Sequence, residues 1–351
     1  MASTQATTRL EGLDLARYLA FVGMVIVNFK VVMGSMGDGD GPLWVLTGAL
    51  EGRAAATFVV LAGIGLGLAA GKRLHQTRIV TLKRAAFLLA VGLLNVLVFD
   101  ADILHYYAFY FLFGALLLPL SSRALVYVIL ALNLGFVVLA MALDFDAGWD
   151  WDTFSYPEFW TPVGFVRNLL FNGWHPVVPW LGFLLFGLIL SRLNLSAPGV
   201  QWRLALGGVA AMLVAEVVSA VLTPWFASID PELAHFARTH PVPPVPLYFL
   251  AGIGAASVVV GLCLRFAPAL ARFGVLGLVA PAGRQTLTLY IGHILIGMGV
   301  LEEMGLIGGQ DIETAVVASL TFCALATVYA WIWSRFFVRG PVEWVMRKVA
   351  G

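Results

Sequence analysis

Few side chains in this sequence could do acid–base chemistry, and three histidines lie in or beside long apolar runs. His105 follows Asp102 by three residues in FDADILHYYAFYFLFG, a spacing that places both side chains on one helix face. A carboxylate bonded to one imidazole nitrogen fixes the tautomer and raises the basicity of the other nitrogen. This pair therefore predicts His105 as a general base oriented by Asp102. The alternative is a polar cap at the start of a helix, where the helix dipole favours aspartate.

Two further histidines are candidates. His293 lies about halfway along an apolar run in GRQTLTLYIGHILIG, where it is either a base or a hydrogen-bonded structural group. His175 precedes a proline in NGWHPVVPW, which disfavours helix at that residue and marks a helix entrance at the outer surface. We interpret His175 and the adjacent Trp174 as substrate-binding residues, with a solvated helix cap as the alternative for His175.

Charged residues near the ends of the first two apolar runs supply the next candidates. Asp14 and Arg17 form a D-x-x-R pair on one helix face, and they are either a local ion pair or, for Arg17, part of a site for an anionic cofactor. Glu51 and Arg53 begin the second run and are expected at the outer surface, where we assign them to substrate binding. Lys30 is expected to extend its amine to the outer interface, with a polar cavity as the alternative.

A lone glutamate, Glu216, lies near the middle of a later apolar run. Such a group must be paired, protonated or facing a cavity, and Lys30 or a histidine is its expected partner. A relay formed by Glu216, Lys30 and His293 is the basis of an alternative function, the transport of a small solute.

The composition decides the fold class. The chain is 60% hydrophobic and 12% charged, with a mean hydropathy of +0.91, whereas soluble domains carry roughly 25% charged residues. Only helix bundles and closed barrels satisfy their backbone groups in lipid, and the apolar runs exceed the roughly 9–11 residues of a barrel strand. We therefore predict an all-α integral membrane protein. The net charge of +1 predicts no nucleic-acid partner.

The sequence predicts about ten transmembrane helices in a single domain, 1–351. The apolar runs cover residues 15–35, 54–71, 85–99, 103–120, 124–143, 176–191, 204–222, 247–264, 285–301 and 314–334. With the N-terminus inside, alternation of the runs places 17 of the 21 Lys and Arg residues on the cytoplasmic side. Tails 1–14 and 335–351 would then be cytoplasmic, and the location would be a cell inner membrane. We expect no cleaved signal peptide.

Several other features are compatible with this membrane interpretation. Cys263 and Cys323 lie in apolar runs and are expected to be small buried residues. The histidines outside the runs show no metal-site spacing, so no metal is predicted. The aromatic-rich loop 144–175 is either a belt at the membrane interface or a lid that stacks on a polar ligand. Glycines in residues 63–71 permit close helix packing, and membrane lipid is an expected partner.

Four segments, in order along the chain, resemble one family. LEGLDLARYLAFVGMVIVNF, DILHYYAFYFLFG, GWHPVVPWLGFLLFGLIL and GRQTLTLYIGHILI are similar to segments of heparan-α-glucosaminide N-acetyltransferase-like membrane acyltransferases and a related bacterial group of uncharacterised membrane proteins. The resemblance implies transfer of an acyl group from cytoplasmic acyl-CoA, acetyl-CoA in particular, to a sugar or other hydroxyl or amine acceptor on the far side. It makes a small-molecule or glycan acceptor the expected partner, and the sequence leaves a homodimer open.

The sequence also departs from the family pattern. Tyr18 stands where the opening motif has glycine, and residues 31–53 contain no histidine, although the family's catalytic histidine is expected in that loop. The base must therefore come from elsewhere, with His105 first and His293 second. A basic cytoplasmic mouth is the further requirement. For that mouth the predicted cofactor-binding residues are Arg17, Arg84 and Arg284.

Overall fold

The computed structural model describes residues 10–37, 39–71 and 73–351, and these residues form helices and no strand. The first nine residues of the expected N-terminal tail lie outside the described residues, as does Lys72. The first half of the chain contains α1 (Glu11–Val32), α2 (Pro42–Gly48), α3 (Arg53–Ala70), α4 (Leu74–Val96), α5 (Leu104–Leu117), α6 (Ser122–Ala142), a 3₁₀ turn (Pro157–Trp160), α7 (Pro162–Arg167), a π-helical turn (Asn168–Asn172) and α8 (Val177–Leu190).

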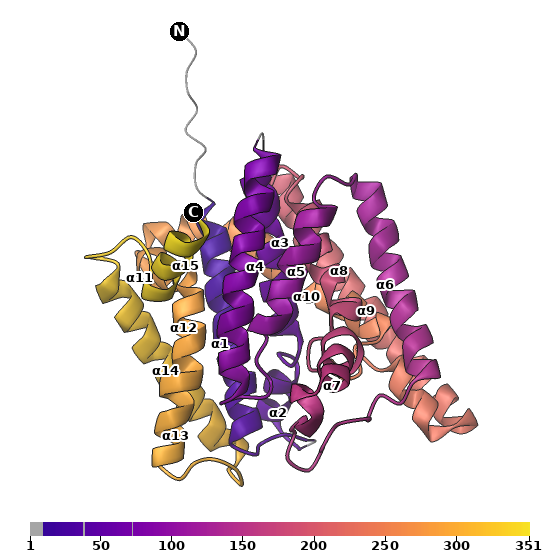
Figure 1. Ribbon diagram of the computed structural model, residues 1–351. Helices are drawn as coiled ribbons and strands as arrows, with labels where there is room; N and C mark the ends of the chain where they lie inside the picture. The colour runs from indigo at the N-terminus through magenta and orange to yellow at the C-terminus, as the bar shows by residue number, and fades with distance from the viewer. Residues whose placement is uncertain (1–9, 38, 72) are drawn as a thin grey trace.

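The second half begins with the longest helix, α9. It contains α9 (Pro198–Ile229), a 3₁₀ turn (Pro231–Ala237), α10 (Pro246–Arg272), α11 (Val275–Arg284), α12 (Thr286–Gly292), a π-helical turn (His293–Met298), α13 (Gly299–Glu303), α14 (Ile312–Trp333) and α15 (Pro341–Ala350). Figure 1 shows the long helices running side by side, with α15 at the same end of the bundle as the start of α1.

Length and composition support a multi-pass membrane protein. Seven helical segments in the described part of the chain are long and apolar enough to cross a membrane, and eight if the bent pair Pro162–Asn172 and Val177–Leu190 forms one span. Two of the expected runs fall on a shorter helix, α5, and on the interrupted segment 286–303. The predicted number of about ten spans therefore stays a prediction, as does the orientation of the termini.

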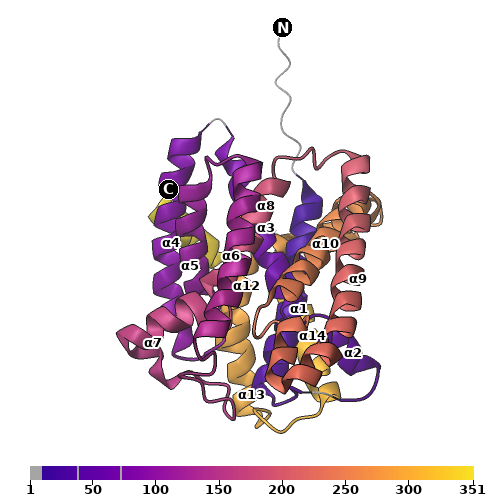
Figure 2. The ribbon, with the colours of Figure 1, turned by 90° about the vertical axis from the view of Figure 1, so that its right-hand side faces the viewer.

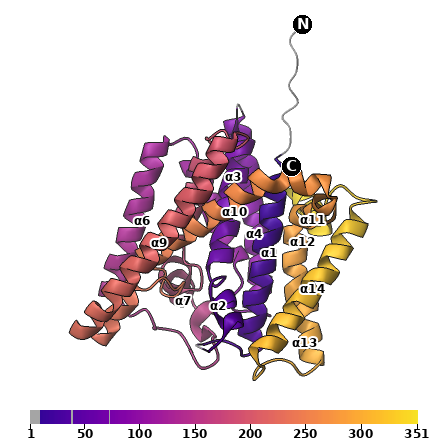
Figure 3. The same ribbon diagram turned by 180° about the vertical axis from the view of Figure 1, so that it is seen from behind.

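The helices divide into a buried centre and a lipid-facing periphery. α1 contacts α3, α10, α11 and α14, and it lies in the middle of the bundle in Figure 1. By contrast, the buried residues of α6 form a single stripe (Leu125, Ile129, Asn133 and Phe136), and α9 leaves most of its apolar side chains exposed. Figure 2 shows α9 at one edge of the bundle, and Figure 3 shows α6 at another. Apolar exposure of this extent is expected where lipid replaces water.

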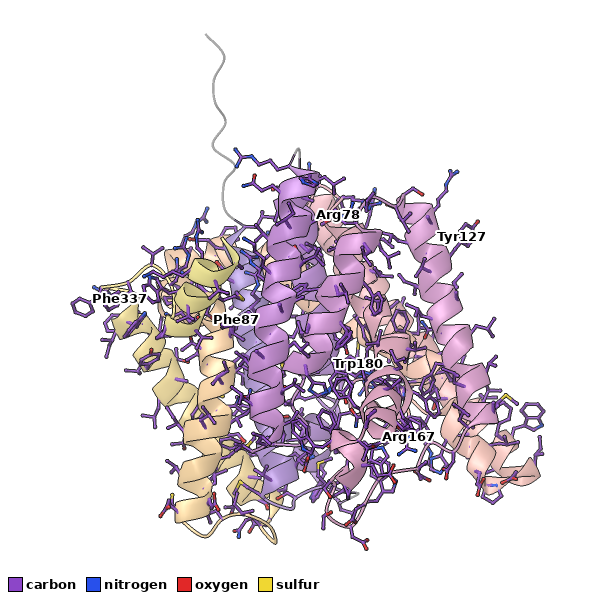
Figure 4. All side chains as sticks on the ribbon, viewed as in Figure 1. Arg78, Phe87, Tyr127, Arg167, Trp180 and Phe337 are labelled. Atoms are coloured by element: carbon purple, nitrogen blue, oxygen red, sulfur yellow. The ribbon has the colours of Figure 1, made fainter. Side chains whose placement is uncertain are left out.

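Close backbone contact joins α3 to α8 at the centre. A Cβ atom placed on Gly63 would lie 2.1 Å from the carbonyl oxygen of Leu184, and one on Gly187 would lie 2.1 Å from that of Val60. Small residues at such positions let helices approach closely in membranes. The expected packing role of the glycines in α3 is therefore confirmed at Gly63. In Figure 4, Trp180 of α8 lies within the bundle, Arg78 lies at one end and Arg167 toward the other.

We predict that Gly63→Ala destabilises the protein, because its added methyl group meets fixed backbone atoms of α8. Overpacking of this kind costs about 1–3 kcal/mol. Thermal unfolding of the detergent-solubilised protein, followed by tryptophan fluorescence, checks this. Gly207→Ala in α9 is the matched control, since a Cβ there meets nothing within 4 Å and alanine is the better helix former. Equal unfolding temperatures for Gly63→Ala and the wild type would contradict the packing argument.

Candidate active site

The turn between α4 and α5 places Asp102 at the centre of a buried polar cluster. Its carboxylate accepts hydrogen bonds from the Asn95 amide (3.1 Å), the backbone N–H of Leu104 (2.8 Å) and the Tyr290 hydroxyl (3.1 Å). The Tyr290 hydroxyl in turn accepts from the backbone N–H of Ile103 (3.2 Å). Asp102 is fully buried, and these donors supply the partners that a buried carboxylate requires.

His105 lies next to Asp102, as the spacing in the sequence predicts. Its Nδ1 is 3.6 Å from an Asp102 oxygen, and neither ring nitrogen has a hydrogen-bond partner among the described residues. The ring is fully buried and packs against Tyr106 and Phe159, with centroid distances of 3.9 and 5.4 Å. A buried imidazole with no partner is costly in a structural role, so the arrangement favours a functional role for His105.

His293 is also buried, but both of its ring nitrogens have partners. Its Nδ1 donates to the backbone carbonyl of Tyr290, so its Nε2 accepts from the Asn28 amide at 2.8 Å. A backbone carbonyl only accepts, which fixes this tautomer. His293 begins the π-helical turn 293–298, and such turns are frequent at functional sites. The pair joins α1 to α12 across the bundle.

A cavity of about 40 Å³ lies between these groups. Its polar lining comes from Asn28, His175 and Tyr290, and its apolar lining includes Met24, Val27, Leu50, Ala101 and Ile103. His175 lies at the break between α7 and α8, and its Nδ1 has no hydrogen-bond partner among the described residues. Neither His105 nor His293 lines this cavity, which we call the inner cavity. The histidine with direct access to it is therefore His175.

A larger cavity of about 550 Å³ opens at the end of the bundle where α4 begins and α15 lies. Its lining includes four arginines, Arg17, Arg73, Arg84 and Arg347, and the described residues that line it include no acidic side chain. Arg17 makes a 2.6 Å ion pair with Asp14, whereas the Nε of Arg84 is buried and has no partner among the described residues. A concentration of guanidinium groups suits a ligand that bears phosphate. We call this cavity the basic mouth.

A third cavity of about 180 Å³ lies between the basic mouth and the inner cavity. The residues it shares with the basic mouth include Arg17, Leu61 and Arg84, and those it shares with the inner cavity are Met24, Ile103 and Tyr290. The remainder of its lining is mostly apolar, except for the Tyr107 hydroxyl, which has no partner among the described residues. The three cavities form a series that leads from the arginines toward His175.

A fourth cavity of about 430 Å³, the outer pocket, lies beyond the inner cavity. Two ion pairs line it, Lys30–Glu51 at 2.7 Å and Arg53–Glu216 at 2.6 Å. The amine of Lys30 is fully buried and also donates to Thr47 at 3.0 Å. The expectation that Lys30 extends to the interface is therefore wrong, because Glu51 and Thr47 hold its amine inside the protein. The partner of Glu216 is likewise Arg53, not the expected Lys30 or a histidine.

A short wall separates the outer pocket from the inner cavity. Successive residues of the segment that joins α2 to α3 face opposite ways: Leu50, Gly52 and Ala54 line the inner cavity, whereas Ala49, Glu51 and Arg53 line the outer pocket. Gly52 has a φ of +67°, which favours glycine. Its carbonyl accepts a hydrogen bond from the Tyr248 hydroxyl at 3.0 Å. This segment therefore lies between the two cavities, and the bond from Tyr248 holds its centre.

Two predicted residues lie away from these cavities. Arg284 ends α11, is exposed, and lines neither the basic mouth nor the cavity that follows it. Trp174 belongs to an aromatic cluster in the loop 144–175, where Trp149 and Trp151 stack at a centroid distance of 4.3 Å and Trp149 meets Trp174 edge-on at 5.2 Å. In the same loop, hydrogen bonds from Thr153 lower the pKa of Asp150 below its ordinary value.

Two residues of the site were missed by the sequence reasoning. Arg347 lies about 330 residues from Arg17 along the chain and reaches the basic mouth from α15. Asn95 looks like any polar residue near a helix end, and only the packing of α4 against α5 brings it to Asp102. Neither position carries a local signal.

Comparisons with known proteins identify the family. Residues 9–221 match the family described as heparan-alpha-glucosaminide N-acetyltransferase, catalytic. The chain belongs to this family. Residues 201–351 match a second family, described as a protein of unknown function (DUF418). The two matches overlap in α9, and residues from both of them line the basic mouth.

One curated relative is Uncharacterized protein YeiB of Escherichia coli (strain K12). It is 32% identical to this chain over 97 residues, which are 28% of this chain and 24% of that protein. The match therefore spans about a quarter of the relative's length. No solved structure matches this chain.

We predict that Lys30→Met lowers the stability of the protein, because Glu51 then loses its cationic partner. Breaking a fully buried ion pair costs about 3–5 kcal/mol, and we expect somewhat less here because the Glu51 side chain is 20% exposed. Thermal unfolding in detergent checks the loss. The double variant Lys30→Met, Glu51→Gln should recover much of it, and a double variant no more stable than the single one would contradict the pairing.

Proposed function

We propose that this protein is a membrane acyltransferase that moves an acyl group from cytoplasmic acyl-CoA, acetyl-CoA in particular, to an acceptor on the outer side. The acceptor would be a sugar or another molecule with a hydroxyl or amine group. Family membership supports acetyltransferase-like chemistry. The observation that carries the proposal is the series of cavities, which runs from four arginines to a histidine with a free ring nitrogen.

The basic mouth is proposed as the site of the donor's phosphate groups. Arg17 and Arg84 extend from α1 and α4, and the buried Nε–H of Arg84 is a donor without a partner among the described residues. Charge-assisted bonds from arginine to phosphate are strong and directional. The mostly apolar cavity of about 180 Å³ would hold the thiol arm of the donor, with its thioester toward Tyr290.

The reaction would take place at the inner cavity. The acceptor oxygen or nitrogen attacks the thioester carbonyl carbon and its proton passes to His175; the carbon–sulfur bond then breaks and the released thiolate takes up a proton. Access favours His175 as the proton acceptor. His105 would then be a positioning residue that acts with Asp102, although the sequence makes His105 the first candidate base. His293 and Asn28 would fix the wall of the cavity through their hydrogen bond.

The same proposal sets the orientation in the membrane. The basic mouth would face the cytoplasm, as would both ends of the chain, in a cell inner membrane. The outer pocket, with Glu51, Arg53 and Lys30, would receive the acceptor. Seven segments satisfy the criteria for spans, and the bent pair Pro162–Asn172 and Val177–Leu190 would be the eighth. With α5 and residues 286–303, the single domain would have ten.

The alternative function, transport of a small solute by a charged relay, lacks the necessary connections. Lys30 pairs with Glu51, Glu216 with Arg53, and His293 with Asn28. A relay needs these groups to hand a proton or ion from one to the next. In the described structure each is instead held by a different partner, which favours the transferase.

We predict that the purified protein binds acetyl-CoA and that Arg84→Gln weakens this binding about tenfold or more, since a hydrogen bond to a charged group contributes roughly 1.5–3 kcal/mol. Isothermal titration calorimetry in detergent checks this. Arg78→Gln is the matched control, because Arg78 lies on the same helix and at the same end but lines none of the four cavities. No binding to a folded wild-type sample would sink the donor assignment.

We predict that substitutions of the histidines differ in their effect on turnover. His175→Gln should lower the turnover of acetyl-CoA in the presence of an acceptor by about 10²–10⁴-fold, the usual contribution of a general base, and leave the KM for acetyl-CoA nearly unchanged. Thiol release, measured across a panel of amino sugars and polyols, reports turnover. His235→Gln, outside these cavities, should retain wild-type activity. If His105→Gln abolishes turnover and His175→Gln does not, His105 is the base.

A further inference from the structure

α15 packs against the two helices that matter most for the donor site. It contacts α4, which carries Arg84, and α12, which carries Tyr290. Figure 1 shows α15 at the end of the bundle where α4 begins. From this position Arg347 lines the basic mouth and Met346 lines the cavity that follows it. The donor site therefore includes a wall that belongs to the segment matching the family of unknown function.

A carboxylate anchors α15 to the first turn of α12. Glu343 accepts hydrogen bonds from the backbone N–H groups of Leu287 (2.8 Å) and Thr288 (3.1 Å), and from the Thr288 hydroxyl (2.5 Å). The same hydroxyl accepts from the backbone N–H of Val342 at 3.0 Å. The first N–H groups of a helix have no partner within it, and the helix dipole favours a negative charge there. Glu343 therefore fixes α15 to α12.

The opposite end of α15 brings a positive charge to a place where it is repelled. Arg347 and Arg84 both line the basic mouth, where their like charges repel, and neither makes an ion pair within the described part of the chain. An anion between the two guanidinium groups would remove this repulsion. Glu343 and Arg347 are four residues apart, so they share one face of α15. Anchor and anion ligand are thus joined by one helical turn.

We propose that Arg347 binds phosphate of the donor and that Glu343 transmits this contact to α12. The inference rests on the proposed function and deepens it. α12 carries Tyr290, whose hydroxyl bonds to Asp102, and His293 follows at the end of this helix. Phosphate binding at Arg347 therefore holds α15 against α4, and through Glu343 it orders the helix that lines the reaction cavity. Arg347 is a binding residue and Glu343 a positioning residue.

The test combines binding with hydrogen exchange, on the full chain in phosphatidylcholine nanodiscs. Arg347→Gln should weaken coenzyme A binding about tenfold or more and leave the weaker binding of pantetheine, which lacks phosphate, unchanged. Lys348→Gln is the matched control, because Lys348 lies over the Trp344 ring and lines no part of the mouth. Equal affinities of the wild type and Arg347→Gln for coenzyme A would overturn the assignment of Arg347.

Glu343→Gln separates anchoring from binding. Coenzyme A should protect the amides of residues 287–292 from exchange in the wild type and in Lys348→Gln. In Glu343→Gln this protection should be lost while coenzyme A still binds within about threefold of wild type, since the mouth keeps its arginines. Unchanged protection in Glu343→Gln would overturn the transmission. Thermal unfolding shows whether each variant folds. If Glu343→Gln does not fold, Glu343→Asp takes its place in the experiment.

Two further experiments are needed. One distinguishes phosphate of the donor from phosphate of a lipid headgroup, and the other distinguishes the phosphate site at Arg347 from the proposed acyl-CoA donor. An effect of Arg347→Gln seen only when phosphatidylglycerol is present would assign Arg347 to a lipid headgroup and overturn the donor assignment. If the wild type ignores coenzyme A but binds ATP in an Arg347-dependent way, the phosphate site stands and the acyl-CoA donor falls. Failure to bind either compound overturns both.

Discussion

Water is absent from the interior of a bilayer, so each polar side chain there needs a partner within the protein. α1 shows this constraint most clearly. Its polar residues gather near its two ends, and they pair within α1 or with other parts of the chain: Arg17 with Asp14, Asn28 with His293, and Lys30 with Glu51. The stretch between these groups is apolar and largely buried. The pairs fix where the neighbouring helices stand around α1, and hence where the cavities lie.

The exceptions to this constraint are concentrated around the proposed site. His105, His175 and Tyr107 each keep a buried polar atom without a partner among the described residues. Asp102, only 3.6 Å from His105, is by contrast fully satisfied by three donors. An unsatisfied buried group costs about 1–3 kcal/mol, so a cluster of them has to be held by the packing around it. Close contacts such as Gly63 against Leu184 and Gly92 against the backbone of His105 supply that rigid packing. Of these three residues, Tyr107 and His175 line the proposed donor cavities and are therefore placed to contact a substrate, whereas His105 lies behind them.

The sequence predicted what depends on neighbours along the chain. Apolar runs located the helices, and the D-x-x-H spacing put Asp102 beside His105. Contacts between distant segments carry no such local signal. Asn28 and His293 are 265 positions apart, and the burial of Lys30 follows from the course of α2, which delivers Thr47 and Glu51 to its amine. Arg284 likewise gives no local sign of its position, at the exposed end of α11 and outside the four cavities.

In the proposed reaction an acyl group would cross the membrane, although neither the donor nor the acceptor crosses it. The wall formed by residues 49–54 bears on how this transfer could happen. In the proposed reaction, a donor in the basic mouth would extend its reactive end only as far as the inner cavity, because the wall lies between that cavity and the outer pocket. An acceptor in the outer pocket would meet the same wall from the other side. The residues before and after Gly52 are each held by an ion pair on the outer-pocket side, Glu51 to Lys30 of α1 and Arg53 to Glu216 of α9, so a displacement of Gly52 has to strain both. Both ion pairs line the outer pocket. A polar acceptor that enters this pocket can replace contacts within these pairs by hydrogen bonds from its own hydroxyl or amine groups. Entry of the acceptor would thus loosen the wall at the moment when the two substrates need to meet, while an empty outer pocket would leave the thioester shielded from outside water.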